Sequence, residues 1–267
     1  MTITIKTLLF LSLLITSIYA NDTLEVCTDN TDWAPFTYYE RDKNGIKKDK
    51  FTGASVDALR IISKKTNINF NISGYPWKRC LKSVELYSKV KKFEAFMDGT
   101  RSKARDEKYL RTDPFYATTI GVFYSRDRFP NDLNISTRKE LAPYKICGIH
   151  GQNYDIYTQL GIKLDTGSKN ITSALKKVLV GRCDVFVGSL EPILGNILLR
   201  NITTPDDKLK YTQIKIKENN EFYFWVSKES PRAKEIVNNM NKAIRQLKKE
   251  GKWEDIYKNY IPTGSGL

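Results

Sequence analysis

Hydrophobic residues recur along this chain with two different periods, and the change of period predicts strands followed by helices. Short apolar runs at residues 24–27 and 68–72 are typical of buried strands. Between them, Val56, Leu59 and Ile62 recur at helical spacing. The first part of the chain therefore predicts a strand–helix–strand unit.

The second half of the chain repeats this order. A strand is predicted at residues 144–149, a helical stripe follows at residues 171–178 and stops at Gly181, and another strand follows at residues 183–187. Strands and helices that alternate in both halves predict an α/β architecture with largely parallel sheets.

The C-terminal region carries the clearest helix signals. Ser230 is a favourable N-cap residue, and Pro231 suits the first turn. An apolar stripe follows at residues 236–247, Gly251 ends it, and a second stripe follows at residues 253–260. We interpret both stripes as core packing that closes a lobe, without a part in any chemistry.

The N-terminus has the pattern of a targeting segment. Lys6 precedes an apolar run at residues 8–15, and Ala20 stands where a signal peptidase would cut. We expect residues 1–20 to be a secretory signal peptide, with an uncleaved anchor as the alternative. No later stretch reaches about 18 apolar residues, so we expect an exported, soluble mature protein.

Export gives meaning to the four cysteines, which are Cys27, Cys80, Cys147 and Cys183. Disulfides form and persist in oxidising compartments, and four cysteines allow three pairings, with free buried thiols as the alternative. There is no Cys-x-x-Cys pair and His150 is the single histidine, which argues against a zinc site. We expect neither a metal nor a cofactor.

The charge of the chain is strongly basic. The formal net charge is +14, from 44 lysines and arginines against 30 acidic residues. The lysines are spread along the chain, and no finger, recognition helix or RNA-binding signature accompanies them. We therefore expect no nucleic-acid partner, although such a field would favour anionic ligands or an anionic surface.

Four sequence blocks, present in a fixed order, carry a resemblance to a known family. They are residues 28–36 with 51–53 and 56–57, residues 99–105 with 112–116, residues 148–154, and residues 181–187 with 249–253. With these blocks the chain resembles the bacterial extracellular solute-binding proteins of the polar-amino-acid type, family 3, over nearly its whole mature length. The resemblance implies a periplasmic location and a small-molecule ligand.

The resemblance also implies a fold, the type II periplasmic-binding-protein-like fold, in which two α/β lobes are joined by two hinge strands. We expect residues 21–118 and 221–267 to form lobe 1 and residues 119–220 to form lobe 2. The crossings are expected near residues 117–123 and 215–223. A ligand would bind in the cleft of a monomer, and the lobes would close about the hinge.

The two-lobe arrangement implies a disulfide pairing. Cys27 and Cys80 both fall in the expected lobe 1, and Cys147 and Cys183 both fall in lobe 2. Crossed pairings would tie the lobes together and oppose closure. We therefore expect Cys27–Cys80 and Cys147–Cys183.

Arg105 is the strongest candidate for ligand binding. Ser102 has the character of an N-cap, which would put Arg105 in the first helical turn. A cation there faces the positive end of the helix dipole, at a cost of about 0.3–1 kcal/mol. In the family, the matching arginine grips a ligand carboxylate, which a guanidinium does bidentately. The alternative is a solvated surface arginine.

The resemblance implies further ligand contacts in lobe 1. Thr100 would hydrogen-bond the ligand carboxylate, and Asp98 would receive an amine. Trp33 and Trp77 fall at cleft-wall positions, where flat side chains stack on a ligand, with core packing as the alternative.

In lobe 2, Gln152 and Asn153 would complete the carboxylate shell from a turn whose backbone N–H groups suit anions. Ser189 is a departure, because amino-acid binders of the family usually place an aspartate there for the ligand's α-ammonium. An unpaired buried ammonium is costly. Either Glu191 or Asp98 takes over that pairing, or the ligand lacks the amine.

Together these residues predict a binding protein that captures a small carboxylate-bearing ligand, an amino acid or a related compound, for an inner-membrane ABC permease. We expect no enzymatic activity. One alternative is a periplasmic dehydratase of the cyclohexadienyl type, with Glu191 as its acid. Another is a ligand-sensing subunit that serves a separate signalling partner.

Overall fold

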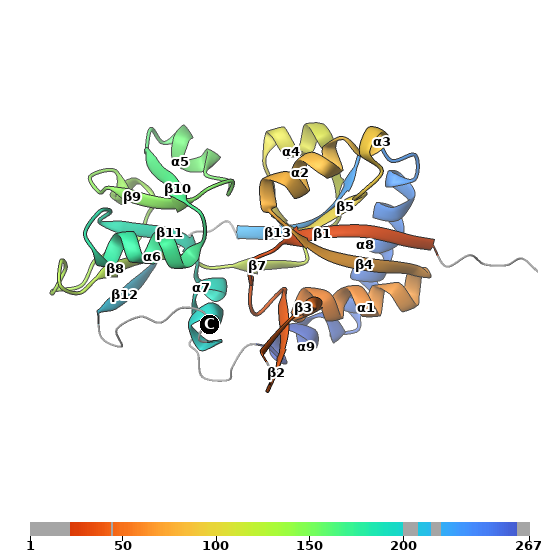
Figure 1. The fold of residues 1–267 in the computed structure, drawn as a ribbon, viewed down its shortest axis with the longest axis horizontal. Coiled ribbons are helices and arrows are strands. Elements are labelled where there is room, and N and C mark those ends of the chain that lie inside the picture. The colour runs from red at the N-terminus through yellow and green to blue at the C-terminus, as the bar shows by residue number, and fades with distance from the viewer. Residues whose placement is uncertain (1–21, 44, 200–207, 215–219, 261–267) are drawn as a thin grey trace, which may run out of the picture.

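The computed structural model describes residues 22–43, 45–199, 208–214 and 220–260. The expected signal peptide at residues 1–20 lies outside this part of the chain. Two β-sheets, each with its own helices, lie side by side, as Figure 1 shows. We call these two bodies the first lobe and the second lobe.

The first lobe is built on a sheet of six strands. They are β1 (Asp22–Asp29), β4 (Ile68–Tyr75), β5 (Ala95–Thr100), β6 (Tyr109–Arg111), β7 (Tyr116–Thr118) and β13 (Asn220–Ser227). The order is β4-β1-β5-β13-β6, and β7 also pairs with β13. β4 and β5 run parallel to β1, whereas β13 runs antiparallel to its partners. The two predicted strands are therefore neighbours in the sheet.

Helices cover both faces of this sheet (Figure 1). They are α1 (Ala54–Thr66), α2 (Trp77–Glu85), α3 (Tyr87–Val90), α4 (Lys103–Lys108), α8 (Ala233–Lys249) and α9 (Lys252–Lys258). Leu59 of α1 and Met240 of α8 belong to the core on one face. Val84 of α2 packs with Trp225 in a separate core on the other face. The predicted C-terminal stripes therefore close the first lobe.

The long C-terminal helix begins later than the sequence predicts. α8 starts at Ala233 with Arg232 in the N-cap position, so the predicted N-cap at Ser230 is wrong. The Ser230 hydroxyl donates to the Glu94 carboxylate at 2.5 Å and accepts from the Arg232 N–H at 3.2 Å. Because Glu94 is a buried acid that also pairs with Arg232, this hydroxyl helps to satisfy a buried charge.

The second lobe is built on a sheet of five strands. They are β8 (Ile120–Ser125), β9 (Ile146–Ile149), β10 (Leu164–Ser168), β11 (Val185–Ser189) and β12 (Leu209–Ile214). The order is β10-β9-β11-β8-β12, in which β8 is antiparallel to both neighbours and the other pairs are parallel. Its helical elements are η1 (Lys139–Leu141), α5 (Asp155–Gln159), α6 (Ile171–Leu179) and α7 (Leu190–Leu198). The predicted stripe of α6 is buried, with Leu175 against Phe186.

A small hairpin is not among the predicted elements. It pairs β2 (Tyr38–Asp42) with β3 (Gly45–Thr52). These strands carry many charged residues and lack the strict alternation that marks a half-buried strand. The hairpin is joined by stacking of Tyr39 on Phe51, with ring centroids 4.4 Å apart.

The connections between the lobes are short where the structure describes them. The chain leaves the first sheet at the end of β7 and enters the second at β8, with Thr119 alone between these strands. It returns between β12 and β13. Residues 215–219 of the expected second crossing lie outside the described residues.

Each disulfide lies within one lobe. Cys27 of β1 is bonded to Cys80 of α2, and Cys147 of β9 is bonded to Cys183, which precedes β11; both Cα–Cα distances are 5.8 Å. The expected pairing is confirmed, and none of the described cysteines is free.

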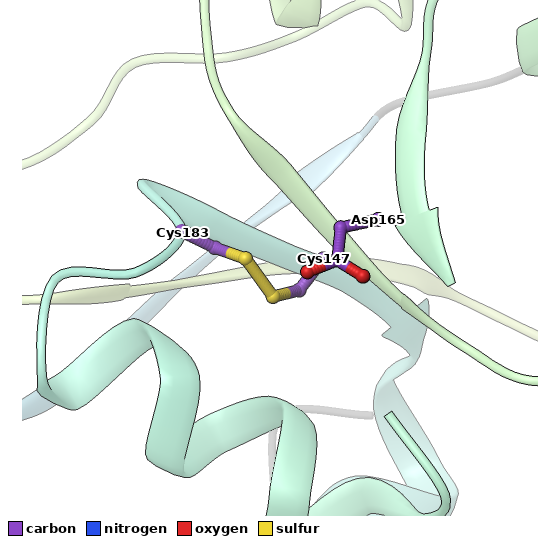
Figure 2. A group of neighbouring side chains, drawn as sticks. All are labelled: Cys147, Asp165 and Cys183. Carbon is purple, nitrogen blue, oxygen red and sulfur yellow. A yellow bond between two sulfur atoms is a disulfide. The ribbon is translucent and has the colours of Figure 1, made fainter. Parts of the chain in front are cut away.

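Figure 2 shows Asp165 of β10 beside the second disulfide. These side chains resemble the donor set of a metal site, but cysteine binds metals as a thiolate, and here Cys147 and Cys183 are bonded to each other. The Asp165 carboxylate accepts from Lys177 Nζ at 2.7 Å. The cluster is a disulfide next to an ion pair.

Candidate ligand-binding cleft

A cavity of about 890 Å³ lies between the two lobes. One wall comes from the ends of β1 and β5 and from α4, and the other comes from the turn before α5 and the end of β11. Eight predicted ligand-binding residues line it: Trp33, Trp77, Asp98, Thr100, Arg105, Gln152, Asn153 and Ser189. Glu191 is not part of its lining. The sequence thus places most of its candidates in one cleft.

Arg105 lies in the first turn of α4, as predicted. The Ser102 side chain accepts a hydrogen bond from the Arg105 backbone N–H at 3.2 Å. The Arg105 guanidinium donates to the Thr100 carbonyl at 2.6 Å and to the Thr100 hydroxyl at 3.1 Å. Its centre lies 5.5 Å from the centroid of the Trp77 ring, which favours the cation.

The electrostatic setting of Arg105 favours an anion. Only 8% of its surface is exposed, and no carboxylate pairs with it in the described part of the chain. Burial lowers the pKa of Arg105 to about 10, while nearby Tyr109 and Asp155 act in the opposite direction. The side chain therefore stays charged at neutral pH. A buried charge without a counter-charge is costly, so a ligand anion would be stabilised here.

Two hydrogen bonds cross the cleft from wall to wall. Trp77 Nε1 donates to the Gly151 carbonyl at 3.1 Å, and Asn153 Nδ2 donates to the Arg101 carbonyl at 2.8 Å. Gly151 has φ of 85°, a conformation that glycine adopts without strain. Each bond therefore joins one predicted residue to a backbone carbonyl of the opposite lobe.

Asp98 is a hub of the first-lobe wall. Its carboxylate accepts from the hydroxyls of Thr37 at 2.7 Å, Tyr116 at 2.9 Å and Ser55 at 3.0 Å. Burial raises the pKa of Asp98, and these hydrogen bonds oppose the rise. Trp33 Nε1 donates to the same Tyr116 hydroxyl at 2.9 Å, which fixes the indole at the cleft wall.

Ser189 sits among neutral polar groups where the chain crosses between lobes. Its hydroxyl accepts from Thr118 Oγ1 at 2.9 Å and from Asn220 Nδ2 at 3.2 Å. Glu191 faces a different group, because both of its carboxylate oxygens accept from the Thr119 backbone N–H, at 2.9 and 3.0 Å. Burial raises the pKa of Glu191, and the bond to Thr119 opposes this. The structure therefore does not bring Glu191 into the cleft.

Several cavity-lining residues are absent from the predicted set, among them Asp29, Arg138, Tyr157 and Asn220. Asp29 is the last residue of β1 and lies in the first family-like block, and this position was a usable signal. No motif or period marks Arg138, which lies in an irregular connection. Tyr157 belongs to a short helix that the hydrophobic pattern does not reveal.

The profile of one protein family matches residues 24–263 of the chain, and its description is bacterial extracellular solute-binding proteins, family 3. The chain belongs to this family. The match spans both lobes and every residue that lines the cleft. The resemblance drawn from the four sequence blocks is confirmed.

Similar proteins include the L-cystine-binding protein TcyA of Bacillus subtilis (strain 168). It is 23% identical to this family 3 chain over 246 residues, which cover 92% of this chain and 83% of TcyA. Among solved structures, a histidine kinase sensor domain with similarity to periplasmic binding proteins has a TM-score of 0.70 at 18% identity. That match covers 90% of this chain and 96% of the other.

A third similar structure is described as the basis of glutathione import in Gram-positive bacteria via GshT and the cystine ABC importer TcyBC of Streptococcus mutans. Its TM-score is 0.69 at 18% identity, and the match covers 90% of this chain and 95% of the other. Likeness at these identities establishes the fold alone. The periplasmic-binding-protein-like fold with two α/β lobes is therefore confirmed. In the ranges that the structure describes, the helices are too short or too polar to cross a bilayer.

Proposed function

We propose that this family 3 protein captures a small carboxylate-bearing ligand, an amino acid or a related compound, in the cleft between its lobes. Arg105 carries the proposal, because it is a buried guanidinium at the cavity wall that lacks a carboxylate partner among the described residues. Thr100 and the Trp77 ring hold it in place. A ligand carboxylate would supply the missing charge through two parallel hydrogen bonds.

The aromatic walls support a ligand with an apolar or planar part. Trp33 is fixed by Tyr116 on one wall, and Trp77 reaches across to Gly151. Stacking on such rings adds to the arginine fork and to hydrogen bonds from Gln152. Micromolar affinity corresponds to about −8 kcal/mol, which a set of this size supplies.

Capture without chemical change is supported by the position of Glu191. A dehydratase would need an acid within reach of its substrate. The Glu191 carboxylate is occupied by the Thr119 N–H, away from the cavity. Burial also raises the pKa of Asp98 and Asp29, which line the cavity, but Asp98 already accepts from three hydroxyls and Asp29 from the Thr31 N–H.

We further propose a periplasmic monomer that hands its ligand to an inner-membrane ABC permease. Membership of a family of extracellular solute-binding proteins supports this role. The name of TcyA, an L-cystine-binding protein, and the cystine ABC importer named with the Streptococcus mutans structure point the same way.

A thermal-shift screen tests the capture of a carboxylate. The probes are the common amino acids with L-cystine and L-arginine, opines, and small carboxylic acids, each beside its carboxamide where one exists. A ligand at 100 times its Kd adds about 2.7 kcal/mol to the free energy of unfolding. We expect at least one carboxylate to stabilise the chain and its carboxamide to fail.

Arg105→Ala is the decisive variant, and Arg126→Ala is its control. Arg126 is an exposed arginine of the second lobe that does not line the cavity. Arg105→Ala is expected to abolish the carboxylate shift, whereas Arg126→Ala keeps it. An unchanged shift in Arg105→Ala would show that the anion is held elsewhere.

A further inference from the structure

A second arginine lines the cleft from the opposite lobe. Arg138 immediately precedes η1, and its guanidinium lies 6.0 Å from the centroid of the Tyr157 ring on α5. Its Nε is buried and has no hydrogen-bond partner among the residues that the structure places. Both Arg138 and Tyr157 line the same cavity as Arg105. The cavity therefore has a cationic group on each of its two walls.

The Tyr157 hydroxyl is also unsatisfied. Tyr157 is 4% exposed, and its buried hydroxyl oxygen makes no well-aligned hydrogen bond within the described residues. Burial raises the pKa of Tyr157, while the positive charge of Arg138 and the contact of its guanidinium with the hydroxyl act in the opposite direction. Buried polar groups in folded proteins are nearly always paired, because leaving one unpaired costs its full desolvation free energy. The Arg138 guanidinium carries only donors and cannot accept the proton of the Tyr157 O–H beside it. That proton and the Arg138 Nε–H together therefore point to an acceptor that arrives from outside the chain.

The acids that line the cavity do not supply that acceptor. Asp98 accepts from three hydroxyls, Asp106 pairs with Arg101 at 2.7 Å, and Glu221 accepts from the Tyr223 hydroxyl. The remaining acids are Asp29, which accepts from the Thr31 N–H, and Asp155, whose charge interacts favourably with Arg105. No ion pair joins any of them to Arg138 among the residues that the structure places.

We infer that Arg138 and Tyr157 form a second anion subsite, and that the ligand carries two carboxylates, one for Arg105 and one for Arg138. This inference rests on the proposed function, because it assumes a carboxylate at Arg105. One guanidinium and one hydroxyl offer donors for a single negative charge, which suits a carboxylate better than a dianionic phosphate. The ligand class is therefore a dicarboxylate, with or without an amine.

Isothermal titration with matched acids tests the second subsite on the full mature chain. The probe pairs are L-2-aminoadipate with L-norleucine and glutarate with valerate, in which the second compound lacks the distal carboxylate. We expect the diacid of at least one pair to bind about tenfold or more tightly than its partner, since a charge-assisted bidentate contact has that effect. Equal binding within both pairs, or no binding of any probe, would overturn the inference.

Two variants separate a ligand subsite from a merely structural contact. Arg138→Gln is expected to remove the preference for the diacid and to leave monoacid affinity unchanged. Arg182→Gln makes the same charge change at an exposed position of the second lobe outside the cavity, and it is expected to keep the preference. Persistence of the preference in Arg138→Gln would refute the subsite.

Tyr157→Phe gives a readout that a structural role would not give. Among the described residues the hydroxyl meets only the Arg138 guanidinium, which is itself a donor, so its removal is expected to leave the Tm of the ligand-free chain nearly unchanged. Diacid binding is expected to weaken about two- to tenfold, as for loss of one hydrogen bond. A lowered Tm with unchanged diacid binding would assign the pair to folding alone.

The two proposals fail in different ways. If diacids bind through Arg138 but Arg105→Ala has no effect on them, the second subsite stands and the proposed role of Arg105 is wrong. If monoacids bind through Arg105 and the added carboxylate changes nothing, the proposed function stands and the second subsite is wrong.

Discussion

The two walls of the cleft differ in how far their polar groups are already paired. On the first-lobe wall, Arg105 is bonded to Thr100, and Asp98 accepts three hydroxyl bonds. On the second-lobe wall, within the part of the chain that the structure describes, Arg138 Nε is buried without a partner and the Tyr157 hydroxyl meets only the Arg138 guanidinium. A wall whose groups are fixed in advance binds at a lower entropic cost. A wall with unsatisfied groups selects between ligands, because a ligand that cannot pair with those groups leaves them buried and unsatisfied.

Removal of a disulfide is expected to have the largest effect on the free energy of unfolding. The experiment tests whether the two lobes, as well as the two walls, differ in stability. The two bonds close sequence separations of 53 and 36 residues, each within one lobe. In the chain-entropy model each contributes about 4 kcal/mol. Replacing each pair by alanines is expected to lower the free energy of unfolding by similar amounts, measured by urea denaturation. A loss confined to one pair would mean that the lobes, and not only the walls, are unequal.

Gly195→Ala perturbs the contact between the lobes on the α7 side. A Cβ at Gly195 would lie 2.3 Å from the Ala34 carbonyl oxygen, and next to it Asn196 Nδ2 donates to the Asp32 carbonyl at 3.0 Å. The clash is expected to cost about 1–3 kcal/mol. This exceeds the gain of about 1 kcal/mol from better helix propensity. Urea denaturation gives the stability, and small-angle scattering is expected to show a wider molecule. A more stable variant of unchanged size would show that α7 shifts freely.

Asp98→Asn tests the paired wall through its pH dependence. Because burial raises the pKa of Asp98 in the folded chain, its stabilising contribution is full below the usual aspartate value of 3.8 and is lost as pH rises through the folded pKa. The asparagine variant does not titrate there. At pH 3 the two side chains are both neutral, and we expect stabilities within about 1 kcal/mol of each other.

The comparison of these two proteins is made by thermal denaturation between pH 3 and pH 7. As pH rises from about 4, the usual aspartate range, the Tm of the wild type is expected to fall relative to that of the variant. The difference in Tm is expected to level off once Asp98 is charged in the folded chain. A constant difference over this range would mean that the Asp98 carboxylate is no more costly folded than unfolded.

Ser189→Ala gives the smallest expected effect and probes the second-lobe wall near the crossing. Its hydroxyl accepts two hydrogen bonds, but Asn220 Nδ2 also donates to Thr118 Oγ1 at 2.8 Å, and that bond survives the change. We expect a loss of about 0.5–1 kcal/mol in the free energy of unfolding. Differential scanning calorimetry measures it, with Thr118→Ser as a control that keeps a hydroxyl. A loss above about 2 kcal/mol would make Ser189 part of a larger network.

The sequence predicts those features that depend on neighbours along the chain. The strand–helix order follows from local period, and the place of Arg105 follows from Ser102 three residues earlier. The three hydrogen bonds accepted by Asp98 have no such local cause, because their donors lie 61, 43 and 18 residues away in the sequence. Resemblance supplied the position of Asp98 in the cleft, but not what its carboxylate would accept.

Glu191 was predicted in the cleft but lies outside it, whereas Arg138 lines the cleft but was not predicted. Glu191 was placed near the cleft by its distance from Ser189, and the direction of its side chain was decided by the Thr119 N–H, 72 residues away. Arg138 reaches the cavity from an irregular connection, where no period relates sequence position to a face. Tertiary contacts, which are set by the whole chain, fix both orientations.

The pairing of Cys27 with Cys80 has a consequence for the order of events as the chain emerges N-terminus first. Both cysteines appear before any strand of the second sheet, whereas β13, which joins β5, β6 and β7, appears after all of that sheet. Early oxidation would therefore form the Cys27–Cys80 bond in a first sheet that still lacks β13. Cys147 and Cys183 also precede β13 in the chain. Both disulfides can therefore form before the last strand of the first sheet is available.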